Sequence, residues 1–254
     1  MEIAQEISRE FMADVGIGHY GDGESASAAA APVRNDGDGG ENPSTASGSH
    51  PIDREDSGER KYVIALGKPY RFEDRDYTEV DLSGLEQLTV QDAIDAQLAL
   101  FGAEPAANMI CETTTAFARQ IAVKATGLPV EFFKLAPRGL SKKIVQAVRA
   151  YLNRTEKQVE NHILPLEQPR WFQGRQVSSV DLSGIADLSS MHESEAENRL
   201  ARAGFMITEN SFNYLYACVI AAMATGLPEE FFTSLPLYEL SKLKNAVNDS
   251  SFFE

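Results

Sequence analysis

The chain has 254 residues, of which 43% are hydrophobic, and a formal net charge of −15. This length allows one or two domains with a hydrophobic core, and the acidic balance argues against nucleic-acid binding, which needs clustered Lys and Arg. No apolar run approaches the roughly 18–20 residues that a membrane-spanning helix needs. The start, MEIAQEISRE, also lacks the basic and apolar regions of a signal peptide. The sequence therefore predicts a cytoplasmic protein that binds neither nucleic acid nor a membrane.

Residues 1–60 are predicted to form an acidic tether. They carry 13 acidic and 4 basic side chains, so −9 of the total charge of −15 lies here and −6 in the remainder. Within them, residues 1–12 place Ile3, Ile7 and Phe11 along one face of a short amphipathic helix. Such a helix either docks on another surface or frays, because short helices are marginal alone in water. The rest is rich in Gly, Ser, Ala, Asp and Pro, which indicates a flexible linker.

From residue 61 the pattern predicts a β-hairpin followed by helices. Strand-forming residues lie on both sides of the polar turn EDRD at 73–76. Thr89 and Asp92 form a capping-box pattern at the start of a helix that we expect to end at Gly102. A second helix is expected over about 108–126.

The pentapeptide ATGLP occurs at 125–129 and again at 224–228. Its glycine stands at the position just after a helix, where glycine adopts the left-handed conformation without a Cβ clash. Its proline prevents the helix from continuing. The residues predicted to have this structural role are Gly127, Pro129, Gly226 and Pro228.

The two ATGLP segments belong to a longer internal repeat. VDLSG occurs at 80–84 and 180–184, and LSK occurs at 140–142 and 240–242, where Ser141 is expected to cap the last helix of the first copy. Ordered matches over about ninety residues indicate tandem duplication. The predicted fold is α+β and mostly α, with two copies of a small domain that has a β-hairpin followed by three to four helices. The predicted parts are a tether at 1–60, a first repeat at 61–153 and a second repeat at 161–254.

No set of residues in the sequence has the spacing of a reaction centre. The four histidines form no HExxH motif, and Cys111 and Cys218 lie in no CxxC motif, so neither suggests a zinc site. Phosphate-binding loops and the GxSxG motif are also missing from the sequence. We therefore expect no catalytic residue, no cofactor and no metal, and two reduced, partly buried thiols.

The EFF segments after each ATGLP contain the most informative apolar residues. In one interpretation their rings all pack on the preceding helix, and in the other they form the aromatic rim of a groove that receives a partner helix. The four candidate partner-binding residues are Phe132, Phe133, Phe231 and Phe232. The phenylalanines at 252–253 form either a tucked tail or a contact site, and we expect the tucked tail.

The order of these motifs resembles the tail assembly chaperone proteins of tailed bacteriophages. The resemblance rests on YTEVDLSGLEQLT and ATGLPVEFFKLAP, covers 61–153 well and 161–254 loosely, and excludes 1–60. It implies a protein of the host cytoplasm that binds the tape measure protein, keeps it soluble, helps to recruit tail tube protein and is absent from the finished virion. The tandem copy departs from the single small domain expected of this family.

The alternative function is a structural minor tail or connector protein of the virion. If the chain is a chaperone, two copies of the domain would supply two modest binding sites that act by avidity, which suits a contact that tube subunits must later displace.

Overall fold

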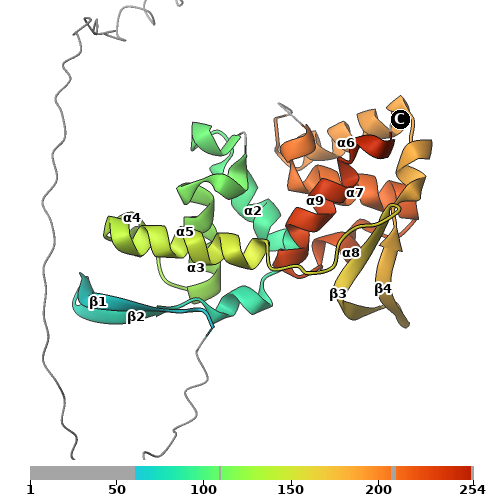
Figure 1. The fold of residues 1–254 in the computed structure, drawn as a ribbon. Coiled ribbons are helices and arrows are strands. Elements are labelled where there is room, and N and C mark those ends of the chain that lie inside the picture. Colours follow the sequence, from blue (N-terminus) through green and yellow to red (C-terminus); the bar gives the residue numbers. More distant parts are fainter. Residues whose placement is uncertain (1–60, 109, 207–209, 253–254) are drawn as a thin grey trace, which may run out of the picture. The chain divides into compact units, whose positions relative to one another are not determined.

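The structure, a computed structural model, describes residues 61–108, 110–206 and 210–252. The expected tether, the expected helix at 1–12 and Phe253 lie outside these residues. The described part has the predicted α+β fold, with two tandem units that each consist of a β-hairpin and several helices (Figure 1). All described residues belong to one compact unit, and buried side chains from both repeats form one hydrophobic core.

The repeats contain corresponding elements in the same order. The first repeat contains β1 (Val63–Phe72), β2 (Arg75–Asp81), the 3₁₀ helix η1 (Ser83–Gln87), α2 (Val90–Leu100), η2 (Pro105–Asn108), η3 (Cys111–Thr113), α3 (Thr115–Thr126), α4 (Val130–Lys134) and α5 (Arg138–Leu152). The second repeat contains β3 (Ile163–Phe172), β4 (Arg175–Asp181), η4 (Ser183–Asp187), α6 (Ser190–Arg202), η5 (Asn210–Phe212), α7 (Tyr214–Thr225), α8 (Glu229–Thr233), η6 (Leu237–Glu239), α9 (Leu240–Val247) and η7 (Ser250–Phe252).

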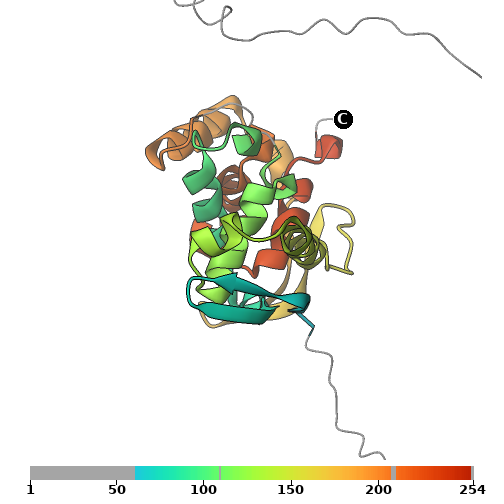
Figure 2. The ribbon, with the colours of Figure 1, turned by 90° about the vertical axis from the view of Figure 1, so that its left-hand side faces the viewer.

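The two hairpins have the same register, one hundred residues apart. Phe72 pairs with Arg75 next to the first turn, and Phe172 pairs with Arg175 next to the second. Both first strands also contain an irregularity in the pairing at the corresponding place. Figure 2 shows β1 and β2 along one side of the helices of their own repeat, where Tyr70 OH donates to the Phe132 carbonyl at 3.0 Å.

The starts of two helices show where local sequence signals succeed and fail. The predicted capping box of Thr89 and Asp92 is present at the start of α2. By contrast, α3 begins at Thr115 and not near 108, because the Thr114 side chain accepts a hydrogen bond from Phe117 N at 3.1 Å and thereby caps the helix. Two short 3₁₀ helices occupy the preceding segment.

The start of the last helix of the first repeat was predicted wrongly. Helix α5 begins at Arg138, directly after Pro137, so Ser141 lies inside the helix and does not cap it. Pro137 is the N-cap residue, with the non-helical φ −51° and ψ 143° that such residues have, and makes no side-chain capping bond.

The contacts of α5 and α9 also show that the two LSK tripeptides do not occupy corresponding positions in the two repeats. Lys143 Nζ donates to the Ala65 carbonyl at 3.1 Å, and Lys242 Nζ donates to the Pro165 carbonyl. These two lysines are 99 residues apart and reach corresponding points of their hairpins, whereas the LSK tripeptides are 100 residues apart. Corresponding residues are 100 positions apart up to the loop before α7, as in VDLSG, and 99 positions apart from ATGLP onward. The lysine contacts show that the spacing of 99 continues into α9.

The repeated motifs VDLSG and ATGLP are two sides of one contact. A Cβ atom added to Gly84 would lie 2.0 Å from the Ala125 carbonyl oxygen, and one added to Gly184 would lie 2.3 Å from the Ala224 carbonyl oxygen. Both glycines are needed because the 3₁₀ helix that contains each one touches the backbone of the last turn of α3 or α7. Both motifs recur in the second repeat with this contact between them.

The ATGLP residues have the predicted conformations. Gly127 and Gly226 are left-handed with φ 69°, and the N–H of each donates to a carbonyl of the preceding helical turn. Pro129 and Pro228 are the N-cap residues of α4 and α8. The sequence pattern therefore ends one helix and starts the next within three residues.

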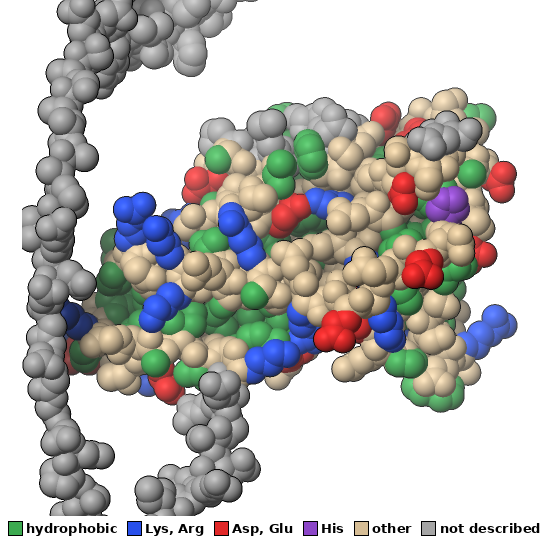
Figure 3. Space-filling view, in the orientation of Figure 1, with side chains coloured by type: hydrophobic (Ala, Val, Ile, Leu, Met, Phe, Trp, Pro, Cys, Tyr) green, Lys and Arg blue, Asp and Glu red, His purple; other side chains and the backbone are tan. Residues whose placement is uncertain are grey.

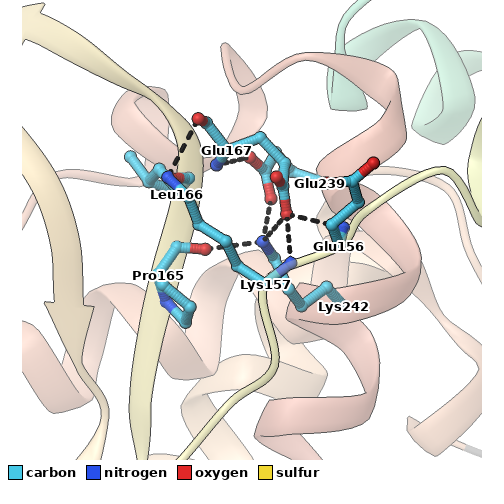
Figure 4. A network of polar contacts seen from close by, with 7 residues as sticks. All are labelled: Glu156, Lys157, Pro165, Leu166, Glu167, Glu239 and Lys242. Atoms are coloured by element: carbon cyan, nitrogen blue, oxygen red, sulfur yellow. Dashed lines mark hydrogen bonds and ion pairs between the residues drawn. The ribbon is translucent and has the colours of Figure 1, made fainter.

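The segment between the repeats is held by a polar network (Figure 4). The backbone N–H groups of Glu156 and Lys157 donate to Glu167 Oε1 at 3.1 and 3.0 Å. Lys242 Nζ lies 3.2 Å from the same oxygen, and the buried Glu239 accepts from Glu167 N at 2.7 Å. The linker is thereby attached to β3 and to the end of the second repeat, which restricts how the two repeats can move apart.

The close contact at Gly84 predicts that alanine destabilises the protein at this position but not at Gly139. Gly84→Ala should lower the free energy of unfolding by about 1–3 kcal/mol or more, because the new Cβ would overlap a backbone oxygen that cannot move freely. Gly139→Ala is the matched control: a Cβ there would meet nothing within 4 Å, and alanine in a helix should raise stability by about 0.5–1 kcal/mol. Urea unfolding followed by circular dichroism measures both. Equal stability of the two variants would contradict the contact.

Candidate partner-binding site

Helix α2 of the first repeat packs against the second repeat. The beginning of α2 in the first repeat lies against η6 of the second, where Val90 N donates to the Leu235 carbonyl at 2.8 Å and Leu237 N donates to the Leu88 carbonyl at 2.9 Å. Leu235 and Leu237 are completely buried. The contact thus combines backbone hydrogen bonds at the helix start with apolar burial along the helix.

Further along α2, a buried glutamine also hydrogen-bonds to the second repeat. Gln97 Nε2 donates to the Phe212 carbonyl at 2.9 Å, and its Oε1 accepts from Tyr214 N at 3.0 Å. Its amide therefore bonds the backbone at the start of α7 through both ends, and a buried amide without such partners would be costly.

An ion pair lies at the edge of the same interface. Glu112 of the first repeat pairs with Lys244 of α9 and accepts from Tyr214 OH at 2.8 Å. Burial raises the pKa of Glu112, but the hydrogen bonds and positive charge around it, chiefly from Lys244, outweigh burial and hold the pKa below its usual value. The ionised carboxylate therefore stabilises the contact between the repeats.

The first repeat has a pocket of about 270 Å³ between α3, α4 and α5, here called the first-repeat pocket. Its apolar lining consists of Phe133, Ala136, Ile144 and Val145. Its polar lining consists of Thr115, Arg119, Lys134, Arg138 and Ser141. Apolar side chains below a rim of cations can bind a helix with one apolar stripe and acidic flanks.

The first-repeat pocket is the counterpart of the place where α2 lies in the second repeat. The residues 99 positions after its lining residues are buried in eight of nine cases: Tyr214, Cys218, Phe232, Thr233, Leu235, Leu237, Leu240 and Leu243. The ninth, the counterpart of Val145, is the half-buried Lys244. Tyr214 and Leu235 hydrogen-bond directly to α2, and Leu237 hydrogen-bonds to Leu88, just before it. The same site is therefore filled in one repeat and open in the other.

Positive charge distinguishes the open site from the filled one. Arg119 replaces the buried Cys218, Lys134 replaces Thr233, and Arg138 replaces Leu237. Figure 3 shows Lys and Arg side chains over α4 and α5. From 132 to 155 the sequence contains six basic and no acidic residues, and this run of charge is the signal from which the site could have been recognised.

Two of these cations are exposed, and the third is partly unsatisfied. Lys134 and Arg138 are exposed and form no ion pair with any of the described residues. Arg119 pairs with Glu104 at 3.0 Å, but its Nε is buried and has no hydrogen-bond partner in the described part of the chain. A buried donor without a partner costs roughly 1–3 kcal/mol, so Arg119 is the least well satisfied of the three cations.

The four phenylalanines proposed for partner binding lie in the core. Phe132 and Phe232 are completely buried, Phe231 is 1% exposed and Phe133 is 5% exposed. The rings of Tyr70, Phe72 and Tyr77 surround Phe132 with centroid distances of 4.8–5.4 Å. The structure thus has the packed arrangement and not an exposed rim, although Phe133 contributes to the pocket lining.

Other candidate features give no site within the described ranges. No group of three His, Cys, Asp or Glu there could hold a metal ion, and none of the helices described has the length and apolar character to cross a membrane. Both cysteines are buried thiols, and burial raises the pKa of Cys111 to about 12. Phe252 is buried and stacks on His162 with ring centroids 4.1 Å apart, as expected for a tucked tail.

Comparison of the chain with protein-family models, curated proteins and solved structures finds no match.

The Glu112–Lys244 pair predicts acid sensitivity of the contact between repeats. Because the folded pKa of Glu112 lies below its unfolded value, its stabilisation is present above about pH 4.3 and is lost as the pH falls through the folded pKa. Glu112→Gln should cost about 1–3 kcal/mol at neutral pH and should lose less stability than the wild type on acidification. Urea unfolding at a series of pH values measures this.

Glu160→Gln is the control, because Glu160 is exposed and its side chain makes no ion pair with the described residues. It should follow the wild-type pH dependence. A Glu112→Gln curve parallel to the wild-type curve would show that the pair contributes nothing to folding.

Proposed function

We propose that the chain is a tail assembly chaperone of a tailed bacteriophage, which binds the tape measure protein in the host cytoplasm and keeps it soluble until tube subunits replace it. The observation that carries the proposal is the open first-repeat pocket, at the position where the second repeat holds a helix. The motif resemblance supplies the identity of the client, because a tape measure protein is a long helical chain with apolar stripes.

The contact between the repeats suggests how a client helix would bind. Its N-terminal turn would lie at Ala136–Arg138, as Val90 lies at Leu235–Leu237, and its apolar stripe would face Phe133 and Ile144. Acidic residues beside the stripe would meet Arg119, Lys134 and Arg138. The preferred client segments are therefore amphipathic helices with acidic flanks.

The structure changes the expected valency of binding. The counterpart pocket in the second repeat is filled by α2, so the two repeats do not provide two equivalent open sites. One modest pocket per chain favours reversible binding, and several chains along one tape measure protein would provide the avidity.

Co-expression with the tape measure protein of the same phage tests the function and the site together. The wild-type chain should raise the fraction of tape measure protein that stays in the supernatant after centrifugation. Lys134→Glu/Arg138→Glu should remove most of this gain, because it reverses the charge of the pocket rim. The control, Lys68→Glu/Arg175→Glu, changes the net charge equally on exposed hairpin residues and should retain the gain.

The outcomes separate the function from the site. No gain with the wild-type chain would reject the chaperone function, whereas an equal gain with both double variants would reject only the pocket. Mass spectrometry of purified virions gives a second criterion: the chain should be absent, and its presence would indicate a structural tail protein.

A further inference from the structure

We propose that the first-repeat pocket also receives helix α6 of a second copy of this chain, so that copies associate head to tail when no client is bound. The inference uses the pocket assigned above but not the identity of its client. It rests on three observations about the surfaces that the internal contact leaves open.

The first observation is that each chain has an open element that corresponds in position to each half of the contact between its own repeats, although the exposed Ser190 stands where α2 has the buried Val90. Helix α6 is the counterpart of α2, and the first-repeat pocket is the counterpart of the site that α2 fills. A second copy in the same pose would place Ser190 N at the Ala136 carbonyl and the Leu188 carbonyl at Arg138 N. Arg138 is the first residue of α5, and its N–H has no acceptor within that helix.

The second observation is that the two open surfaces have opposite charges. Inside the chain, the uncharged Ala93 and Gln97 of α2 are buried, and Gln97 donates to the Phe212 carbonyl. Their counterparts on α6 are Glu193 and Glu197, while the pocket has Arg119, Lys134 and Arg138 where the second repeat is uncharged. Polar residues of either sign would make an end of the repeat array soluble, so opposite signs on the two ends indicate attraction between them.

The hydrogen bonds that Glu193 and Glu197 already make use only one oxygen of each carboxylate. Glu193 accepts from Tyr216 OH through Oε2, and Glu197 accepts from Asn210 Nδ2 through Oε1. The other oxygen of each carboxylate makes no hydrogen bond to the described residues. On the pocket side, the buried Nε of Arg119 has no acceptor in the described part of the chain.

The third observation is an exposed apolar side chain on each surface. Leu135 is 70% exposed beside the pocket, and Met191 is 80% exposed on α6. Their counterparts are the polar Ser234, which directly precedes Leu235, and the polar Gln91, which directly follows Val90; Val90 and Leu235 are the residues joined by the backbone hydrogen bond. A surface that only ended the array would gain polar residues here. The exposed Leu135 and Met191 instead favour a contact between the two surfaces.

This contact is heterologous, since different surfaces of each copy meet, so it would extend into chains and would not stop at a dimer. Exposed ion pairs contribute roughly 0–1 kcal/mol each and are screened by salt. Self-association should therefore be weak and salt-dependent, and it would cover the apolar lining of the pocket until a client helix displaces α6.

Sedimentation velocity of the full chain tests the proposal. At low ionic strength the weight-average sedimentation coefficient should rise steadily with protein concentration beyond the dimer value, and this rise should disappear at high salt. A coefficient that stays at the monomer value at every concentration would overturn the proposal and leave the client function standing.

Charge reversal on each surface gives the decisive comparison. Lys134→Glu/Arg138→Glu reverses the pocket, and Glu193→Lys/Glu197→Lys reverses α6, so each variant alone should remain monomeric. Mixed in equal amounts, they should associate again, because the reversed α6 is complementary to the reversed pocket. Restored association also shows that both variants are folded, whereas a mixture that stays monomeric while circular dichroism shows folded proteins would overturn the contact.

Two milder variants place in each surface the residue that the other repeat has. Leu135→Ser and Met191→Gln should each reduce the concentration dependence without affecting folding, because both side chains are exposed. Trp171→Gln is the matched control, since Trp171 is 74% exposed on β3, outside both surfaces. An effect of Trp171→Gln equal to that of the other two would overturn the assignment of the surfaces.

Discussion

The hydrogen-bonded contact between the start of α2 and η6 organises this molecule. Through Val90–Leu235 and Leu237–Leu88 it turns two copies of a small domain into one compact unit with one core. A domain of about ninety residues has a limited core of its own, and burying the α2 face against the second repeat enlarges it. The same contact decides which pocket is filled and which stays open, so stability and the candidate site follow from one interface.

Divergence between the two copies gives the open pocket a different lining from the filled one. Where α2 covers the second repeat, the lining is mainly apolar, with Leu235, Leu237 and Leu243 completely buried. Where no element of the described chain covers the first repeat, Arg119, Lys134 and Arg138 hold the rim in water while Phe133 and Ile144 keep an apolar base. An uncovered site lined only by leucine would be a permanent aggregation surface. The cations keep the rim hydrated, and they are the basis for proposing an acidic helix as its occupant.

Local features were predictable from the sequence and contacts between distant segments were not. The hairpin turns, the Thr89–Asp92 capping box and the left-handed Gly127 and Gly226 follow from interactions within a few residues. The burial of Phe132 depends on rings from β1 and β2 some sixty residues away, and the α2 contact joins segments more than a hundred residues apart. The LSK match misled because one tripeptide agrees by chance at an offset of 100, whereas the lysine contacts with the hairpins follow 99.

The candidate site was hidden for a related reason. Each of its cations is an ordinary surface residue in sequence, and only the comparison with the second repeat shows that they replace residues of a buried interface. A tandem repeat thus allows each residue of the open site to be compared with its counterpart in the filled site. Arg119 makes the point most sharply: its counterpart Cys218 is buried without charge, whereas its own Nε is buried without an acceptor among the described residues. The unsatisfied donor at a position that has no polar group in the closed repeat is therefore the feature on which the proposal of an acidic partner depends most directly.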